Sequence, residues 1–128
     1  MRLLLDTHAF LWWIFDDPRL SSTARTLIAD PSAEILFSVV SAWEIAIKSR
    51  TGRLDLPPDV PAFIHDQIRR NRFTVLPIEL RHALQVHALP GHHRDPFDRL
   101  LVAQAQVETV PMLSTDTQIA AYDVTLRW

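Results

Sequence analysis

Along this chain, brief apolar segments alternate with longer segments of helical periodicity, and this alternation limits the folds that the chain can adopt. Nine prolines fall almost entirely between these segments, where they end elements because proline fixes φ and has no amide hydrogen. Brief apolar runs bounded by polar residues are typical of buried strands. Strands that alternate with helices predict a parallel sheet with helices on both faces.

We expect a central parallel sheet of about five strands between two layers of helices, a three-layer α/β/α fold. In such folds ligands bind beyond the carboxyl ends of the strands, so polar residues that follow strands are candidate functional residues. The predicted strands are residues 2–5, 34–38, 73–76, 112–114 and 124–127. The predicted helices are residues 7–15, 21–29, 40–50, 60–71, 79–88, 96–107 and a short one at 117–122.

Composition narrows the class of protein. A chain of 128 residues, 48% hydrophobic and 22% charged, fits one folded domain over residues 1–128. The absence of cysteine excludes disulfides, thiolate zinc sites and cysteine nucleophiles. Asp6 and His8 interrupt the first apolar run, and residues 9–15 are too few to span a bilayer. We therefore expect a cytoplasmic protein without a membrane segment.

Four carboxylates lie at corners between predicted strands and helices. Asp6 follows the first strand directly, Glu44 lies in the helix after the second strand, and Asp116 follows residues 112–114. Asp98 lies in the first turn of the helix that begins at Pro96. The topology would allow all four side chains to meet at the carboxyl edge of the sheet.

Each acid also has a structural interpretation. Asp6 and Asp116 are suitable helix N-caps, and residues 41–44 (Ser-Ala-Trp-Glu) form a capping-box pattern. Asp95 is a suitable N-cap for the helix at Pro96, where the helix dipole favours Asp98. From the sequence alone, both the structural and the functional interpretation remain open for each acid taken singly.

Taken together, the four acids indicate a metal centre. Carboxylates that only capped helices at one sheet edge would repel one another, and a divalent cation removes that cost. Oxygen ligands of this kind suit Mg²⁺ or Mn²⁺ rather than zinc. Such ions lower the pKa of water and neutralise a phosphodiester during in-line attack, which points to nuclease chemistry.

Four segments together resemble the PIN-domain family, and more narrowly the VapC toxins of bacterial toxin–antitoxin pairs. The segments are Leu4-Leu5-Asp6-Thr7, Ser41-Ala42-Trp43-Glu44-Ile45, Asp95-Pro96-Phe97-Asp98-Arg99-Leu100-Leu101 and Leu113-Ser114-Thr115-Asp116. The resemblance covers nearly the whole chain, in order and at fitting spacing. It implies the α/β/α PIN fold, a Mg²⁺- or Mn²⁺-dependent endoribonuclease, a homodimer and a small VapB-like antitoxin that covers the active site. The RNA substrate is unspecified, and transfer RNA is one candidate.

The resemblance also implies roles for individual residues. The catalytic acids would be Asp6, Glu44, Asp98 and Asp116, with Asp6, Asp98 and Asp116 holding the metal and Glu44 orienting a water or a second ion. The hydroxyls of Thr7 and Ser114 would orient these carboxylates. Asp95 would cap its helix first and neighbour the metal second.

Basic residues and histidines near these segments have weaker predictions. Lys48 forms either an i,i+4 ion pair with Glu44 or a phosphate contact, and we leave both open. Among the twelve arginines (thirteen basic residues less Lys48), Arg94 and Arg99 flank the third segment and are the best candidates for RNA contacts. His92 and His93 are adjacent in a loop, so we do not expect both rings to ligate one zinc ion. One of the two rings would contact RNA or assist proton transfer.

Two other functions remain as alternatives. A catalytically inactive PIN-like module would bind or scaffold without cleaving RNA, although all four acids are retained. A phosphohydrolase with Asp6 as nucleophile fits poorly, because the haloacid dehalogenase-like pattern needs a second aspartate where this chain has His8.

Overall fold

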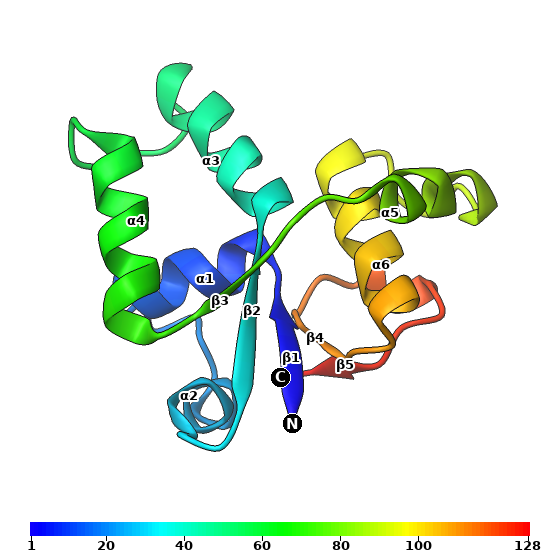
Figure 1. Ribbon diagram of the computed structural model, residues 1–128, viewed down its shortest axis with the longest axis horizontal. Helices are drawn as coiled ribbons and strands as arrows, with labels where there is room; N and C mark the ends of the chain where they lie inside the picture. Colours follow the sequence, from blue (N-terminus) through cyan, green and yellow to red (C-terminus); the bar gives the residue numbers. More distant parts are fainter.

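The computed structural model describes residues 1–128 and contains a five-stranded, wholly parallel sheet in the order β3-β2-β1-β4-β5 (Figure 1). This confirms the predicted sheet. The strands are β1 (Arg2–Leu5), β2 (Glu34–Ser38), β3 (Thr74–Leu76), β4 (Met112–Leu113) and β5 (Leu126–Arg127). The helices are α1 (Thr7–Ile14), α2 (Ser22–Ala29), α3 (Val39–Arg50), α4 (Val60–Asn71), α5 (Leu80–Gln85) and α6 (Pro96–Glu108), with 3₁₀ turns η1 (Val86–Ala88) and η2 (Ile119–Ala121).

Helices cover both faces of the sheet. Helices α1, α2 and α4 lie on one side and α5 and α6 on the other, as Figure 1 shows. Strand β1 alternates between the two cores, since Leu3 and Leu5 belong to the first cluster and Leu4 to the second. A strand covered on both faces has no polar side to present, which is why Leu3, Leu4 and Leu5 are all apolar.

The largest deviations from the predicted elements lie in the second half of the chain. The helix predicted at 117–122 is only the turn η2, and the one predicted at 79–88 divides into α5 and η1. The strand predicted at 124–127 is reduced to Leu126–Arg127. It pairs only with Met112 and Leu113, so the two residues of β4 limit its length. None of the helices combines the length and apolarity that a membrane span needs.

A buried polar link joins α6 to the carboxyl end of β2. The Ser38 hydroxyl donates to Gln104 Oε1 at 2.5 Å, and Gln104 Nε2 donates to the Pro77 carbonyl at 3.1 Å. Both Ser38 and Gln104 are fully buried, so neither can exchange its partner for water. These hydrogen bonds hold α6 in position against the edge of the sheet where the acids lie.

We expect Gln104→Leu to lower the free energy of unfolding by about 1–3 kcal/mol, because it leaves buried polar groups without partners. Urea denaturation monitored by circular dichroism would measure the change. The matched control is Gln118→Leu, since Gln118 is exposed and its side chain makes no hydrogen bond. Equal stability of the two variants would contradict the prediction.

Candidate metal centre and active site

Strand β1 delivers Asp6 and Thr7 to the carboxyl edge of the sheet. Asp6 caps α1 by accepting the Ala9 amide at 2.7 Å through Oδ1, yet it is only 5% exposed. Burial raises the pKa of its carboxyl above the usual value, the Ser114 hydroxyl and the Ala9 amide oppose this, and the charge of Asp116 adds to it. Asp6 is therefore both a helix cap and a member of an acidic group.

Glu44 reaches the same place from α3. Its Oε1 accepts the Thr7 hydroxyl at 2.6 Å, and its Oε2 pairs with Lys48 one helical turn later. Thr7 also lies 2.9 Å from the Ser41 hydroxyl oxygen. The capping-box interpretation of residues 41–44 is wrong, because α3 begins earlier and its cap is Ser38, whose hydroxyl accepts the Val40 amide.

Asp98 comes from the first turn of α6. The cap of this helix is Asp95, as expected, which accepts the amides of Phe97 and Asp98 through Oδ1 at 2.8 and 3.3 Å. Burial, followed by the charges of Asp95 and Glu44, raises the pKa of Asp98 to about 7. Asp6 contributes in the same direction and His93 opposes. The carboxylates of these elements thus lie close enough to act on one another.

Asp116 follows β4. Its amide donates to the Ser114 hydroxyl at 3.1 Å, and its Oδ1 accepts the Gln118 amide at 2.8 Å. Ser114 is buried and reaches Asp6 as well, so it connects the ends of β1 and β4. The structure therefore brings together all four acids and both hydroxyl residues that the sequence singled out.

His93 lies inside this acidic group, which the sequence interpretation did not anticipate. Its Nε2 is 2.9 Å from Asp98 Oδ2 and hydrogen-bonded to Asp116 Oδ2 at 3.2 Å. The neighbouring His92 lies outside the acids and packs edge-on against Tyr122. The only sequence signal was the proximity of His93 to the third motif, which does not distinguish it from His92.

The basic residues are placed unequally. Lys48 forms the ion pair with Glu44. Arg99 directs its guanidinium inward onto the carbonyls of Val86, Leu89 and Pro90, so the RNA contact predicted for it has no support in the structure. Arg94 is exposed and directly precedes Asp95 in the chain.

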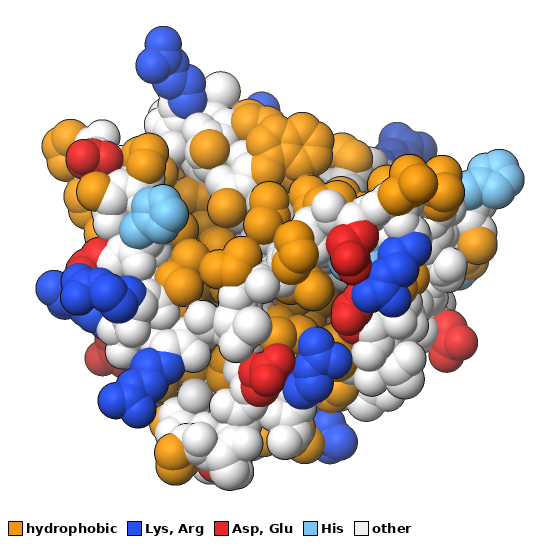
Figure 2. All heavy atoms as spheres, viewed as in Figure 1, with side chains coloured by type: hydrophobic (Ala, Val, Ile, Leu, Met, Phe, Trp, Pro, Cys, Tyr) orange, Lys and Arg blue, Asp and Glu red, His pale blue; other side chains and the backbone are white.

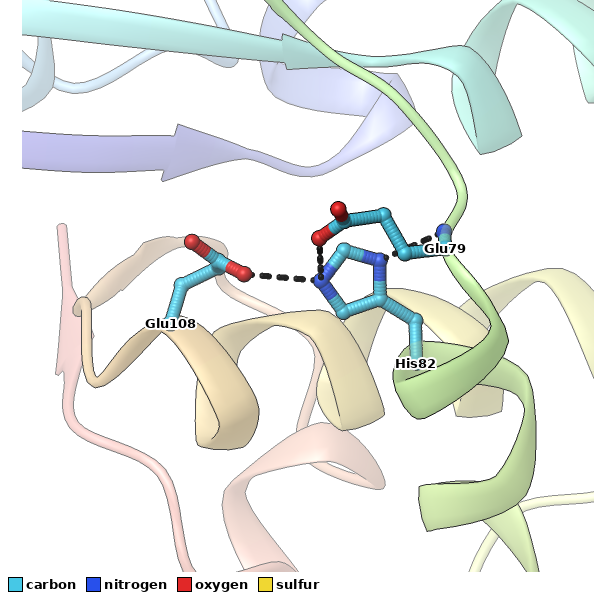
Figure 3. A group of neighbouring side chains, drawn as sticks. All are labelled: Glu79, His82 and Glu108. Atoms are coloured by element: carbon cyan, nitrogen blue, oxygen red, sulfur yellow. Dashed lines mark hydrogen bonds and ion pairs between the residues drawn. The ribbon is translucent and has the colours of Figure 1, made fainter.

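A second group of metal-ligating residues lies at the far end of α6 (Figure 3). His82 accepts the Glu79 amide through Nδ1, so its ring proton is on Nε2, which donates to Glu108 at 2.8 Å. Arg81 also donates to Glu108, at 2.6 Å, and together these contacts lower the pKa of Glu108. Because His82 Nε2 carries a proton and the Arg81 guanidinium lies beside Glu108, this group is an internal network of hydrogen bonds and ion pairs rather than a metal site.

The acids at the sheet edge fit a divalent cation better. They offer carboxylate oxygens, which hard cations such as Mg²⁺ and Mn²⁺ prefer. Burial, and after it repulsion from Asp95, Glu44 and Asp6, raise the pKa of Asp98, and His93 only partly opposes this rise. Asp6, Asp98 and Asp116 are the residues available to hold the ion.

This fold and site define the PIN domain class of protein, and the chain belongs to the PIN domain family, which it matches over residues 3–124. Among characterised relatives it is similar to ribonuclease VapC16 of Mycobacterium tuberculosis, with 36% identity over 74 residues. That match covers 55% of this chain and 51% of the relative, about half its length.

Three solved structures share the fold. VapBC2 of Rickettsia felis, bound to a DNA fragment from its promoter, superposes with a TM-score of 0.74 at 13% identity, covering 99% of this chain and 98% of that one. FitAcB of Neisseria gonorrhoeae gives 0.66 at 16% identity, covering 97% and 95%. VapBC-1 of nontypeable Haemophilus influenzae gives 0.65 at 15% identity, covering 99% and 97%.

Proposed function

We propose that this protein is a metal-dependent endoribonuclease of the VapC type, the toxin of a toxin–antitoxin pair, acting on cytoplasmic RNA. The observation that carries the proposal is the convergence of Asp6, Glu44, Asp98 and Asp116 at one sheet edge, with an Asp98 pKa of about 7. The similarity to a ribonuclease named VapC16 supports the same substrate class.

The residues of the site have distinct tasks in this proposal. Asp6, Asp98 and Asp116 would hold Mg²⁺ or Mn²⁺, which when bound supplies a water of lowered pKa and charge neutralisation for the phosphodiester. Thr7 and Lys48 fix the two oxygens of Glu44, whose charge acts on Asp98, and Glu44 would orient a water. Ser114 orients Asp6 through its hydroxyl. Arg94 remains the candidate phosphate contact.

Cleavage of total cellular RNA, with mapping of the new ends, tests the function. Products should appear with Mg²⁺ or Mn²⁺ and vanish with a chelator. Cleavage that persists in the chelator would overturn metal dependence. RNA binding without cleavage at any metal concentration would favour the inactive binding module, and release of phosphate from small esters would favour the phosphohydrolase.

We also propose a VapB-like antitoxin as partner, because two of the structural neighbours are VapBC complexes. A short adjacent reading frame with a DNA-binding amino-terminal part should yield a protein that co-purifies with this chain and suppresses cleavage. Failure of that protein to bind would contradict the pairing and leave the nuclease proposal intact.

A homodimer is the second proposed assembly. Large apolar side chains are exposed on α3 and α5, where Trp43 is 52%, Leu80 76% and Leu84 64% exposed. Figure 2 shows hydrophobic side chains gathered on the face that α3 and α5 present. Exposed apolar patches on folded proteins commonly mark contacts with other chains, and a second copy would cover this one.

We expect the double variant Leu80→Glu, Leu84→Glu to halve the mass in solution, because two carboxylates would be buried against an apolar surface. Sedimentation velocity measures the mass. Phe15→Glu, at an exposed apolar position at the end of α1, serves as control and should leave the mass unchanged. A monomeric wild-type protein would refute the dimer.

A further inference from the structure

We propose that His93 is a positioning residue of the metal centre, whose Nε2–H group holds Asp98 and Asp116 in the arrangement that binds the ion. The inference rests on the proposed function, because it assigns a task to a residue beside the carboxylates that would hold the metal. The contact joins the start of α6 to the end of β4, two elements whose acids no other side chain bridges.

The hydrogen bonds around the imidazole determine which nitrogen carries the proton. The Asp95 amide donates to His93 Nδ1 at 3.1 Å, so Nδ1 has its lone pair occupied and no proton. The ring proton is then on Nε2, which faces the two carboxylates. A protonated nitrogen cannot ligate a cation, so His93 acts as a donor to the ligands and not as a ligand itself.

The loop that carries His93 is anchored, so the ring is held in place. The His93 amide donates to the Tyr122 hydroxyl at 2.8 Å, and Tyr122 is buried. Arg99 Nη1 donates to the same hydroxyl at 3.1 Å and to the Pro90 carbonyl at 2.9 Å. This explains why Arg99 turns inward: its guanidinium clamps the loop that presents His93.

The fixed Nε2–H donor of His93 favours metal binding because it orients the two carboxylates. Each carboxylate can direct one oxygen to the ion while Oδ2 keeps its contact with His93 Nε2, as carboxylate ligands in metal sites usually do. Asp98 and Asp116 are then already close before the ion arrives. A ring that had to leave would instead compete with the ion, and the anchored loop opposes such movement.

Mn²⁺ affinity, measured by the loss of the free-ion paramagnetic resonance signal, tests the proposal on the purified full chain. We expect His93→Ala to weaken binding about 10–100-fold. His93→Gln, whose amide can place an N–H near the position of Nε2, should recover most of the affinity. His92→Ala is the matched control, because it removes the adjacent ring outside the acids, and should bind as wild type.

Nitrogen-15 spectra of the histidine side chains distinguish a hydrogen-bond donor to the metal ligands from a metal ligand. The Nε2–H tautomer of His93 should persist when Mg²⁺ is added. Loss of that proton on Mg²⁺ addition would make His93 a ligand and overturn the proposal, and so would tighter Mn²⁺ binding by His93→Ala.

The Asp98→Asn variant tests the metal centre independently of the positioning role of His93. If Asp98→Asn loses Mn²⁺ binding while His93→Ala binds as wild type, the positioning role is refuted and the metal centre stands. If Asp98→Asn binds Mn²⁺ as wild type, the metal centre itself is refuted, together with the inference.

Discussion

The Asp6→Asn variant should cleave RNA about a thousandfold more slowly than the wild type while unfolding at the same temperature or above. Loss of a metal-holding carboxylate removes several kcal/mol of charge stabilisation in the transition state, and about 4 kcal/mol corresponds to a thousandfold. Asparagine keeps a carbonyl oxygen where Asp6 Oδ1 accepts the Ala9 amide, so the cap of α1 is preserved. It also removes a charge whose burial is unfavourable.

Rates on a labelled RNA and thermal unfolding by circular dichroism measure the two properties on the same samples. Asp59→Asn is the matched control, because Asp59 caps α4 in the same way through the Ala62 amide and makes no contact with the acids. It should cleave at the wild-type rate. Full activity of Asp6→Asn would remove Asp6 from the mechanism, and an equal loss in Asp59→Asn would attribute the effect to handling or folding.

The Asp98→Asn variant should be more stable than the wild type above pH 7 and equally stable near pH 4, with metal absent. Folding raises the pKa of Asp98 from its ordinary value of 3.8 to about 7, so the folded protein retains a proton that the unfolded chain releases. The contribution of this carboxyl to stability therefore falls as the pH rises from about 4 to about 7, and is constant above. Asparagine has no proton to lose.

The size of the effect follows from the shift. About three pKa units correspond to about 4 kcal/mol as an upper bound, and because neighbouring acids share the repulsion we expect about 2 kcal/mol. Urea denaturation in chelator across this pH range measures it. Asp30→Asn should show the opposite sign, because hydrogen bonds from Ser32 lower the pKa of Asp30. A stability gain that does not change with pH would contradict the assignment.

Much of this protein could be predicted from short-range patterns. The apolar run before Asp6 identifies β1, and Asp95 followed by Pro96 identifies the start of α6, because caps and burial act within a few residues of the chain. The same patterns placed the four acids at strand-to-helix corners, and the resemblance to the PIN-domain family added the hydroxyls of Thr7 and Ser114. The patterns failed at η2 and β5, where element length depends on a partner strand rather than on local preference.

Local patterns in the amino-acid sequence therefore specify which elements form and which acids follow them. Only the tertiary structure decided that β1 lies between β2 and β4, which places Asp6 beside the acids of α3 and β4. It also decided that Thr7 binds Glu44 across 37 residues and that His93, rather than His92, reaches Asp98 and Asp116. The physical reason is that these contacts depend on the packing of residues distant in the chain, about which local periodicity and capping carry no information.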